Sequence, residues 1–484
     1  MAGRVRNEGA DKYVFMWGQY QSIMHGCYQQ PQLFFLQGWK PAFTPFFSYK
    51  NGYMAGFFPE RGILALRESG KAALKPTEGK RRLEFSRGRR RIFWKFISRL
   101  EREKLALMDD AKLARLFEIY GWCLTGLFIA FTYSTPFSTY FLEEEIRRIL
   151  RTKLPEKQIL NAFIILSTPP ELDETQLERM DWLELHSGKD KGDLELMAHA
   201  RKYPGLFANV YDEKEALNFL RNKLANEKPD KNEERKIREN LVRARREQEE
   251  LYLKFKGTEL RQYSQLLQNL AIERFKVKLC WGGAEFLALN LFREIAKRGN
   301  ARLSDLFFAY TPQDVISLIK KHKKIPEMEV KRRKGHFCIF FEGKSTKFKT
   351  LSGEKSRRKM QHVLQGSLPI GAKELVGQTA NLGRATGTAR IILAHDLRQF
   401  ERDLHDFRDG EVLVTTMTSP GMVLIAKKAA AIVADEGGIC SHAAVISREL
   451  DIPCIVGTKD ATRIFKTGDK LEVDATRGVV RRLQ

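Results

Sequence analysis

From Gly371 to Gln484 the chain alternates short apolar runs with helical patterns, and this alternation restricts the fold more than any other feature. Short runs rich in valine and isoleucine between turn residues are typical of buried strands. Chains that alternate strand and helix in this way fold as layers around one core. We therefore expect a β/α domain of about 110 residues at this end of the chain. The predicted strands are residues 387–393, 411–417, 430–434, 454–456, 470–474 and 479–482, and the predicted helices are 420–428 and 441–450.

The segment GGICSHAAVISRELDIPCIVG, from Gly437 to Gly457, places His442 just after a glycine pair and at the start of the second predicted helix. Unpaired backbone N–H groups and the positive end of the helix dipole gather there, so they can stabilise a phosphoryl group. Gly437 and Gly438 permit close backbone approach, and a free imidazole titrates near neutrality, which supplies an unprotonated nucleophile. His442 is thus a candidate phosphoryl acceptor. The alternative is a helix-capping or packed histidine.

Three neighbours of His442 are further candidates. Ser441 can cap the helix or donate to a phosphate. Arg448 can hold the anion, or lock the turn by pairing with Glu436 or Asp435. Cys440 is either a redox-active modulator next to a helix start or a small packed side chain.

These segments resemble the mobile phosphohistidine domain of the phosphoenolpyruvate-utilising enzymes, the family of phosphoenolpyruvate synthase and pyruvate phosphate dikinase. The resemblance rests on LGRATGTARI, TSPGMV, GGxxSHAA and RELDIPCIVG. It implies a swivelling β/β/α domain in which His442 is phosphorylated and Gly437, Gly438, Ser441 and Arg448 support the phosphate. It also implies Mg²⁺ and either ATP or phosphoenolpyruvate, although no site for them is readable in the sequence and no metal site is predicted. Many family members have threonine at the position of Cys440; in plant-type dikinases this threonine is a regulatory phosphorylation target, and that control does not carry over.

Residues 1–80 are predicted to form an aromatic-rich α/β unit. Asn51 and Gly52 stand between apolar runs and predict a hairpin. The aromatic side chains indicate an aromatic core, with an aromatic-lined ligand pocket as the alternative.

Residues 81–320 are predicted to form a helical domain with a long helical hairpin. Residues 234–255 carry one apolar stripe at helical spacing, and the exposed turn of the hairpin is expected at 226–234. Thr311 and Pro312 predict a helix start. Residues 321–370 are predicted to form a short β-hairpin and a basic linker, with strands on either side of Glu342 and Gly343. The whole chain is therefore expected to be an α+β multidomain protein whose last domain is 371–484.

Positive charge is concentrated outside the last domain. The net charge is +24, and residues 371–484, with 16 basic and 15 acidic residues, account for only +1 of it. Basic and aromatic residues interleave in residues 80–96, around Arg89, Arg90 and Arg91. This favours an alternative function, a catalytically retired protein that binds nucleic acid or another polyanion; a solvated basic surface is the simpler interpretation.

The leading hypothesis is a phosphotransfer protein, a transferase that carries phosphate on His442 between ATP or phosphoenolpyruvate and an acceptor. The family's ATP-grasp and barrel modules are not recognisable, so the expected partners are a separate ATP-grasp or acceptor protein and a phosphate-bearing small molecule. Residues 293–319 resemble, more weakly, the helical segment before the mobile domain in this family. The longest apolar stretch, 121–131, is shorter than a membrane span, and the six cysteines are scattered. We therefore expect a cytoplasmic protein without a membrane partner.

Overall fold

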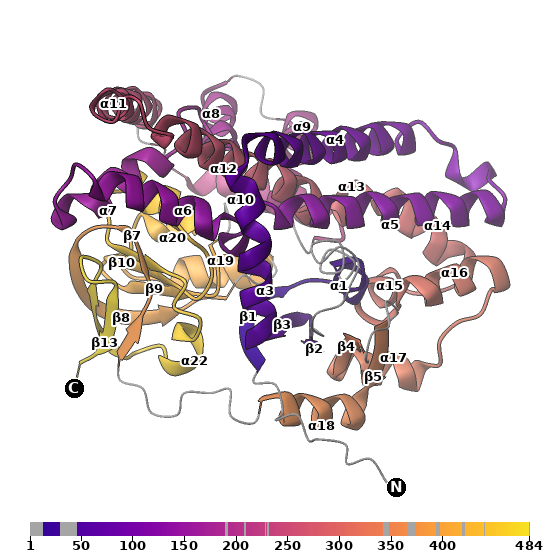
Figure 1. Ribbon diagram of the computed structural model, residues 1–484. Helices are drawn as coiled ribbons and strands as arrows, with labels where there is room; N and C mark the ends of the chain where they lie inside the picture. Colours follow the sequence, from indigo (N-terminus) through magenta and orange to yellow (C-terminus); the bar gives the residue numbers. More distant parts are fainter. Residues whose placement is uncertain are drawn as a thin grey trace, which may run out of the picture.

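Two sheets and a large helical body make up the described part of the chain, in the mixed α+β arrangement expected from the sequence (Figure 1). The computed structural model describes residues 13–29, 46–188, 192–207, 210–227, 229, 232–341, 348–364, 374–393, 397–418, 422–439 and 441–483. The helical body lies along the top of Figure 1, above one sheet on each side.

The first sheet is antiparallel and has five strands in the order β1-β3-β2-β4-β5. Asn51 and Gly52 connect β2 to β3 with φ angles of 49° and 90°. Positive φ at both central residues is the geometry of the tight hairpin turn that Asn-Gly favours, so the predicted hairpin is confirmed. The strands are β1 (Tyr13–Tyr20), β2 (Phe46–Lys50), β3 (Tyr53–Pro59), β4 (Phe337–Phe341) and β5 (Phe348–Ser352).

The second hairpin, β4 and β5, extends this same sheet although it lies almost 300 residues later in the sequence. Phe340 pairs with Phe46, and Ile339 pairs with Phe47. The two strands fall where the sequence predicted them, and Glu342 and Gly343 between them lie outside the described residues. The apolar side chains that β2 and β4 share, including Phe47 and Ile339, hold this long-range pairing together.

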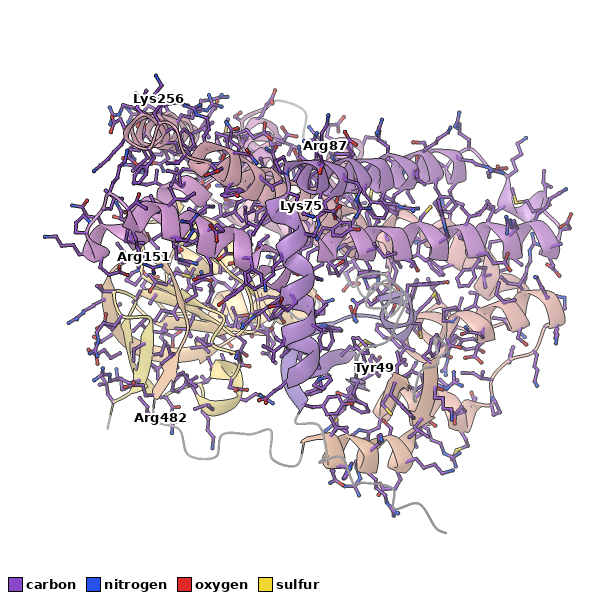
Figure 2. The ribbon with its side chains drawn as sticks, viewed as in Figure 1. Tyr49, Lys75, Arg87, Arg151, Lys256 and Arg482 are labelled. Atoms are coloured by element: carbon purple, nitrogen blue, oxygen red, sulfur yellow. The ribbon has the colours of Figure 1, made fainter. Side chains whose placement is uncertain are left out.

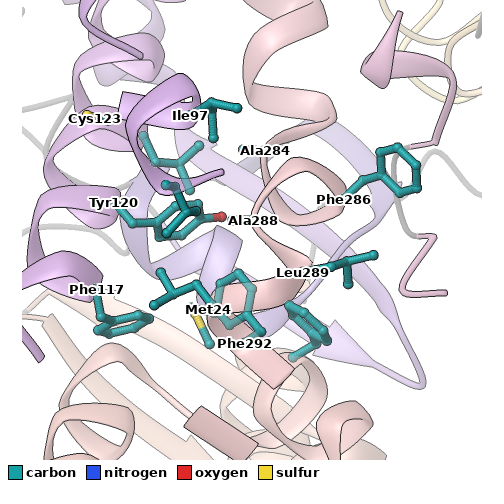
Figure 3. Packing of buried hydrophobic residues seen from close by; sticks show 14 of the residues in the cluster. Met24, Ile97, Phe117, Tyr120, Cys123, Ala284, Phe286, Ala288, Leu289 and Phe292 are labelled. Atoms are coloured by element: carbon teal, nitrogen blue, oxygen red, sulfur yellow. The ribbon is translucent and has the colours of Figure 1, made fainter. Parts of the chain in front are cut away.

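The helical body packs around a core of aromatic and aliphatic side chains (Figure 3). The rings of Tyr120 and Phe292 meet edge to face, with centroids 5.3 Å apart, a favoured arrangement for buried aromatic pairs. The helices are α1 (Ile23–Gln29), α3 (Glu60–Gly70), α4 (Pro76–Leu100), α5 (Asp110–Thr132), α6 (Pro136–Arg151), α7 (Glu156–Ser167), α8 (Glu174–Ser187), α9 (Asp193–Lys202), α10 (Glu213–Asn226), α11 (Glu233–Lys254), α12 (Leu260–Gly282), α13 (Ala284–Leu287), α14 (Leu289–Arg298), α15 (Leu303–Ala309), α16 (Pro312–Lys321), α17 (Glu327–Gly335) and α18 (Gly353–Leu364), with 3₁₀ turns at Lys71–Leu74, Leu105–Leu107 and Pro204–Phe207.

Two predicted helix features have different outcomes. The start at Pro312 is confirmed, since Thr311 and Asp314 form a reciprocal capping box. Helix α11 also forms where its apolar stripe predicted it, but it packs on α7 and α8 and not along α10 as a long hairpin would. The amide of Gln248 explains this placement, because it donates to the carbonyls of Ile165 and Thr168.

In the part of the chain that the structure describes, one helical stretch, Asp110–Arg151, is long and apolar enough to cross a membrane, and it contains the apolar residues 121–131. Its most apolar window is 72% buried inside the fold, as is also common for the core helix of a soluble protein.

The second sheet has eight strands in the order β6-β13-β12-β8-β9-β10-β11-β7. Strands β8 to β11 are parallel neighbours, and the outer strands are antiparallel. All six predicted strands are present, whereas β6, β7, α19 and α22 were not predicted, and residues 419–421 at the predicted helix start lie outside the described part. The elements are β6 (Glu374–Val376), β7 (Gln378–Asn381), β8 (Arg384–Ile391), α19 (Leu397–Asp406), β9 (Val412–Thr415), α20 (Val423–Ala426), β10 (Ala431–Ala434), α21 (His442–Glu449), β11 (Cys454–Val456), α22 (Ala461–Ile464), β12 (Lys470–Asp474) and β13 (Val479–Arg482).

Candidate functional site

His442 is the first residue of α21, and its side chain is only 6% exposed. Its Nδ1 lies 2.8 Å from the hydroxyl oxygen of Thr418. Its Nε2 is buried and has no hydrogen-bond partner among the described residues. The imidazole is therefore held by one nitrogen and leaves the other without a protein partner.

The prediction that the His442 imidazole titrates near neutrality is wrong for the folded chain. Burial, and next the positive charge of Lys278, lower the pKa of His442 to about 3. The ring is consequently neutral at pH 7, so its nucleophilic form is the one that the fold favours.

The glycine pair shapes the turn in front of His442. Gly437 has a φ of +108°, and a Cβ built on it would lie 2.9 Å from the Cβ and Oγ of Ser441. Both constraints favour glycine. The carbonyl of Gly438 accepts a hydrogen bond from the Ser441 amide at 2.9 Å. The two glycines thus bring Ser441 into position at the helix start.

Ser441 is the N-cap of α21, since its hydroxyl accepts from the Ala444 amide. Arg448 locks the turn, but by a route different from the one expected. Its guanidinium donates to the carbonyls of Ala444, at 2.8 Å, and Ile439.

The predicted pairing of Arg448 with Asp435 or Glu436 is not observed, because both carboxylates have other partners. Asp435 accepts from Thr458 and from the backbone amide and hydroxyl of Thr462. Glu436 accepts from the backbone amide of Gly18 at 2.8 Å, which ties the turn to strand β1.

Cys440 lies outside the described residues, so the structure does not bear on either interpretation of this thiol. Within the described ranges, no group of three or more histidine, cysteine, aspartate or glutamate side chains is arranged to hold a metal ion. The structure thus identifies no Mg²⁺ site among these residues.

The C-terminal domain is docked on the helical body through this same turn. Ile439, between Gly438 and Cys440, is 1% exposed and joins an apolar cluster formed mainly by α6, α7 and α12. Arg448 Nη1 also donates to the hydroxyl of Thr168 at 2.6 Å. At the edge of the contact, Lys427 pairs with Glu233 at 3.1 Å.

Glu449 at the end of α21 takes part in the same docking contact. It accepts a hydrogen bond from the side chain of Gln176 on α8. Burial, and next the nearby carboxyl of Asp173, raise the pKa of Glu449 to about 8. The docked arrangement therefore favours the protonated form of this side chain.

Sequence reasoning missed two residues that define the surroundings of His442. Thr418 stands in the motif TSPGMV, so its position was visible, but its contact with the ring was not. No sequence pattern indicated a role for Lys278, because it is one lysine within the long helix α12. Its Nζ lies 3.6 Å from the sulfur of Met417, and its charge acts on His442.

The basic cluster on α4 is partly engaged within the fold, although Arg91 is exposed. Arg87 and Arg90 pair with the buried carboxylate of Glu273 at 3.3 and 3.0 Å. The guanidinium of Arg89 lies over the rings of Phe85 and Trp122. Figure 2 shows Arg87 in the upper helical layer, away from Arg482 in the C-terminal domain. Part of the charge of this cluster is therefore paired or stacked within the fold.

Comparison with known proteins concerns the C-terminal domain. Residues 407–478 match the family described as "PEP-utilising enzyme, mobile domain". A stretch of 94 residues is 52% identical to phosphoenolpyruvate synthase of Pyrococcus furiosus and covers 19% of this chain and 11% of that enzyme. A stretch of 110 residues is 50% identical to the probable phosphoenolpyruvate synthase of Staphylothermus marinus and covers 22% of this chain and 13% of that protein. The chain thus spans only about an eighth of the length of these relatives.

Among solved structures, the NMR structure of Enzyme I is 28% identical and covers 18% of this chain and 42% of that one. Its TM-score is 0.15, which is too low to support a conclusion about the fold.

Proposed function

Because the C-terminal domain belongs to the family of PEP-utilising mobile domains, we propose that this protein is a phosphotransferase component that carries a phosphoryl group on His442. One observation carries the proposal. The ring is neutral, its Nδ1 is fixed by Thr418, and its Nε2 is left without a partner among the described residues.

Nucleophilic attack through Nε2 requires the tautomer in which Nδ1 bears the hydrogen and donates it to the Thr418 oxygen. The Nε2 lone pair then forms a bond to phosphorus as the bond from phosphorus to the donor's leaving oxygen breaks, and the leaving group keeps that electron pair. The start of α21 lies beside the ring, so its positive dipole end favours the charge that arrives.

In the docked arrangement His442 is buried, so a donor cannot approach Nε2 from solvent. Transfer therefore needs the domain to leave the helical body and return. The polar contacts of the docked state are few, and two of them, Lys427–Glu233 and Arg448–Thr168, can be replaced by water. We propose that docking protects His442 and that undocking exposes it.

We further propose that the donor, ATP or phosphoenolpyruvate, is bound together with Mg²⁺ by a partner protein such as a separate ATP-grasp or acceptor protein. The support is that the matched segments correspond to only 11% and 13% of the length of the related phosphoenolpyruvate synthases. When bound there, Mg²⁺ would neutralise phosphate charge.

The test uses the full chain with lysate of the source organism and labelled ATP or phosphoenolpyruvate. We expect label that is lost in acid and kept in alkali, that requires one donor, and that is absent from His442→Ala. His405→Ala is the matched control, because His405 is an exposed histidine in the same domain, and it should label like the wild type. Label that survives in His442→Ala, or that resists acid, would remove the proposal.

A further inference from the structure

A cavity of about 340 Å³ lies where the first sheet, the helical body and the C-terminal domain meet. Trp17 and Phe58 line it from the sheet, Phe131 and Trp281 line it from helices α5 and α12, and Glu436 and Gly437 line it from the C-terminal turn. Its volume is within the range of small-molecule sites, roughly 300–1,000 Å³. Docking of the C-terminal domain therefore completes a chamber of ligand size.

Two buried hydrogen-bond donors in the wall of this cavity have no acceptor among the described residues. Trp281 is 7% exposed, and its indole Nε1 has no hydrogen-bond partner among the described residues. The Nε of Arg67 is likewise buried without a partner there, while its guanidinium lies 4.7 Å from the centre of the Tyr140 ring. Buried donors are nearly always satisfied, so these two indicate an acceptor that belongs to a ligand.

The charge of the wall is predominantly positive. Arg67, Arg274, Lys278 and Lys459 all line the cavity. The Lys278 ammonium contacts the sulfur of Met417, and Glu436 is the acidic group whose charge acts on it.

The two carboxyl groups in the wall, those of Asp435 and Glu436, are outnumbered by the four basic side chains and offset only part of this charge. Asp435 is engaged by Thr458 and Thr462, and Glu436 accepts from the Gly18 amide. Burial raises the pKa of Glu436 and favours its neutral form. An anionic group is therefore the complement of this wall.

Aromatic rings form much of the remaining wall, and they suit a flat apolar body. We propose that the cavity binds a small amphipathic anion, with a ring-shaped apolar body and one phosphate or carboxylate group. The anionic group would be held by Lys278 and Arg67, and one of its oxygens would accept from the Trp281 indole. Most of the wall lies outside the segment that matches the family, residues 407–478, and the proposal does not rest on phosphorylation of His442.

The probes are 1-naphthyl phosphate, 1-naphthoate and neutral 1-naphthol, titrated into the full chain by calorimetry and by tryptophan fluorescence. We expect one or both anions to bind at one site per chain and to change the tryptophan emission. The neutral probe should bind about tenfold more weakly or worse, because it lacks charge-assisted hydrogen bonds. The stronger of the two anions identifies the head group as phosphate or carboxylate.

Lys278→Met and Arg67→Met keep the apolar stems and remove the charges, and each should weaken the anion by about tenfold or more. Lys276→Met is the matched control: it removes a charge from the same helix, outside the cavity wall, and should bind like the wild type. Circular dichroism of each variant checks its fold, and the use of two independent variants keeps the test valid if one of them fails to fold.

Three outcomes would each overturn the proposal. They are equal binding of 1-naphthol and the anions, anion binding that is unchanged in both variants, and no anion binding at millimolar concentration. Binding of the anions to His442→Ala with unchanged affinity would show that the cavity acts independently of the phosphohistidine.

Discussion

The hydroxyl oxygen of Thr418 lies 2.8 Å from Nδ1 of His442, and this contact decides which ring nitrogen remains for chemistry. With Nδ1 engaged, Nε2 is the nitrogen that has no partner among the described residues. The Thr418 hydroxyl, in the segment after β9, thus determines that Nε2 of His442, at the start of α21, is the reactive nitrogen.

Replacing Thr418 with valine removes that hydroxyl and keeps the side-chain shape. We expect His442 to be phosphorylated about tenfold more slowly, because one hydrogen bond that orients the ring and selects its tautomer is lost. Thr416→Val is the matched control, since the buried Thr416 hydroxyl has no hydrogen-bond partner in the part of the chain described here. The measurement is the initial rate of acid-labile labelling. Equal rates in the two variants would contradict the role given to Thr418.

The buried, neutral state of His442 predicts a pH dependence of stability. Its pKa in the folded chain, about 3, lies below the ordinary value of 6.5, so the unfolded chain binds a proton that the folded chain does not. The contribution of His442 to the free energy of unfolding is therefore fully present above pH 6.5. It is lost as the pH drops from 6.5 towards 3, by up to about 1.4 kcal/mol per pH unit.

His442→Gln should lose this component, so its unfolding free energy should fall less than that of the wild type between pH 7.5 and 5. Carboxyl groups such as Glu449 contribute equally to both proteins and cancel in the comparison. Urea unfolding at the two pH values measures the effect, with His405→Gln as the control that keeps the wild-type slope. Parallel curves for wild type and His442→Gln would show that the ring is not buried in solution.

Gly437→Ala should destabilise the turn in two ways. The φ of +108° strains any side-chain-bearing residue, and the new Cβ would lie 2.9 Å from Ser441. We expect a loss of about 2–4 kcal/mol in unfolding free energy. Gly468→Ala is the matched control, because its φ is +99° but nothing lies within 4 Å of its Cβ position. If the two variants lose the same stability, the contact with Ser441 has no role.

Arg448 performs two tasks that two substitutions can separate. Arg448→Met removes its bonds to the carbonyls of Ala444 and Ile439 and its bond to Thr168. Of these three bonds Thr168→Val removes only the last, together with the bond from the Thr168 hydroxyl to the Ile164 carbonyl. We expect losses of about 2–4 kcal/mol and about 1 kcal/mol in unfolding free energy, respectively. Hydrogen exchange then locates the effects: Thr168→Val should loosen the docking contact and leave α21 protected. Loss of protection in α21 in both variants would refute this division.

Local sequence patterns predicted much of the C-terminal domain. The apolar runs there coincide with buried strands such as β10 and β11, because a strand covered on both faces must be apolar throughout. The Asn51–Gly52 turn was readable for a similar reason, since the two residues themselves determine its backbone geometry.

Long-range relationships were not readable. The pairing of β2 with β4 joins strands almost 300 residues apart, and the packing of α11 depends on acceptors in α7 that no local pattern reveals. At the site, the sequence identified His442 as the candidate but did not reveal its burial. That burial comes from Ile439 and its neighbours docking on the helical body, and docking depends on complementary surfaces, not on residue spacing.

The most direct test of the central claim is to locate the phosphate on the labelled protein. The chain, containing ¹⁵N-histidine, would be phosphorylated with its donor and examined by NMR for coupling between ³¹P and a ring nitrogen. The structure predicts one signal, with phosphorus bonded to Nε2 of His442, that is absent from His442→Ala. Phosphate on Nδ1 would contradict the part assigned to Thr418, and phosphate on any other residue, or none in the presence of donor and lysate, would contradict the account as a whole.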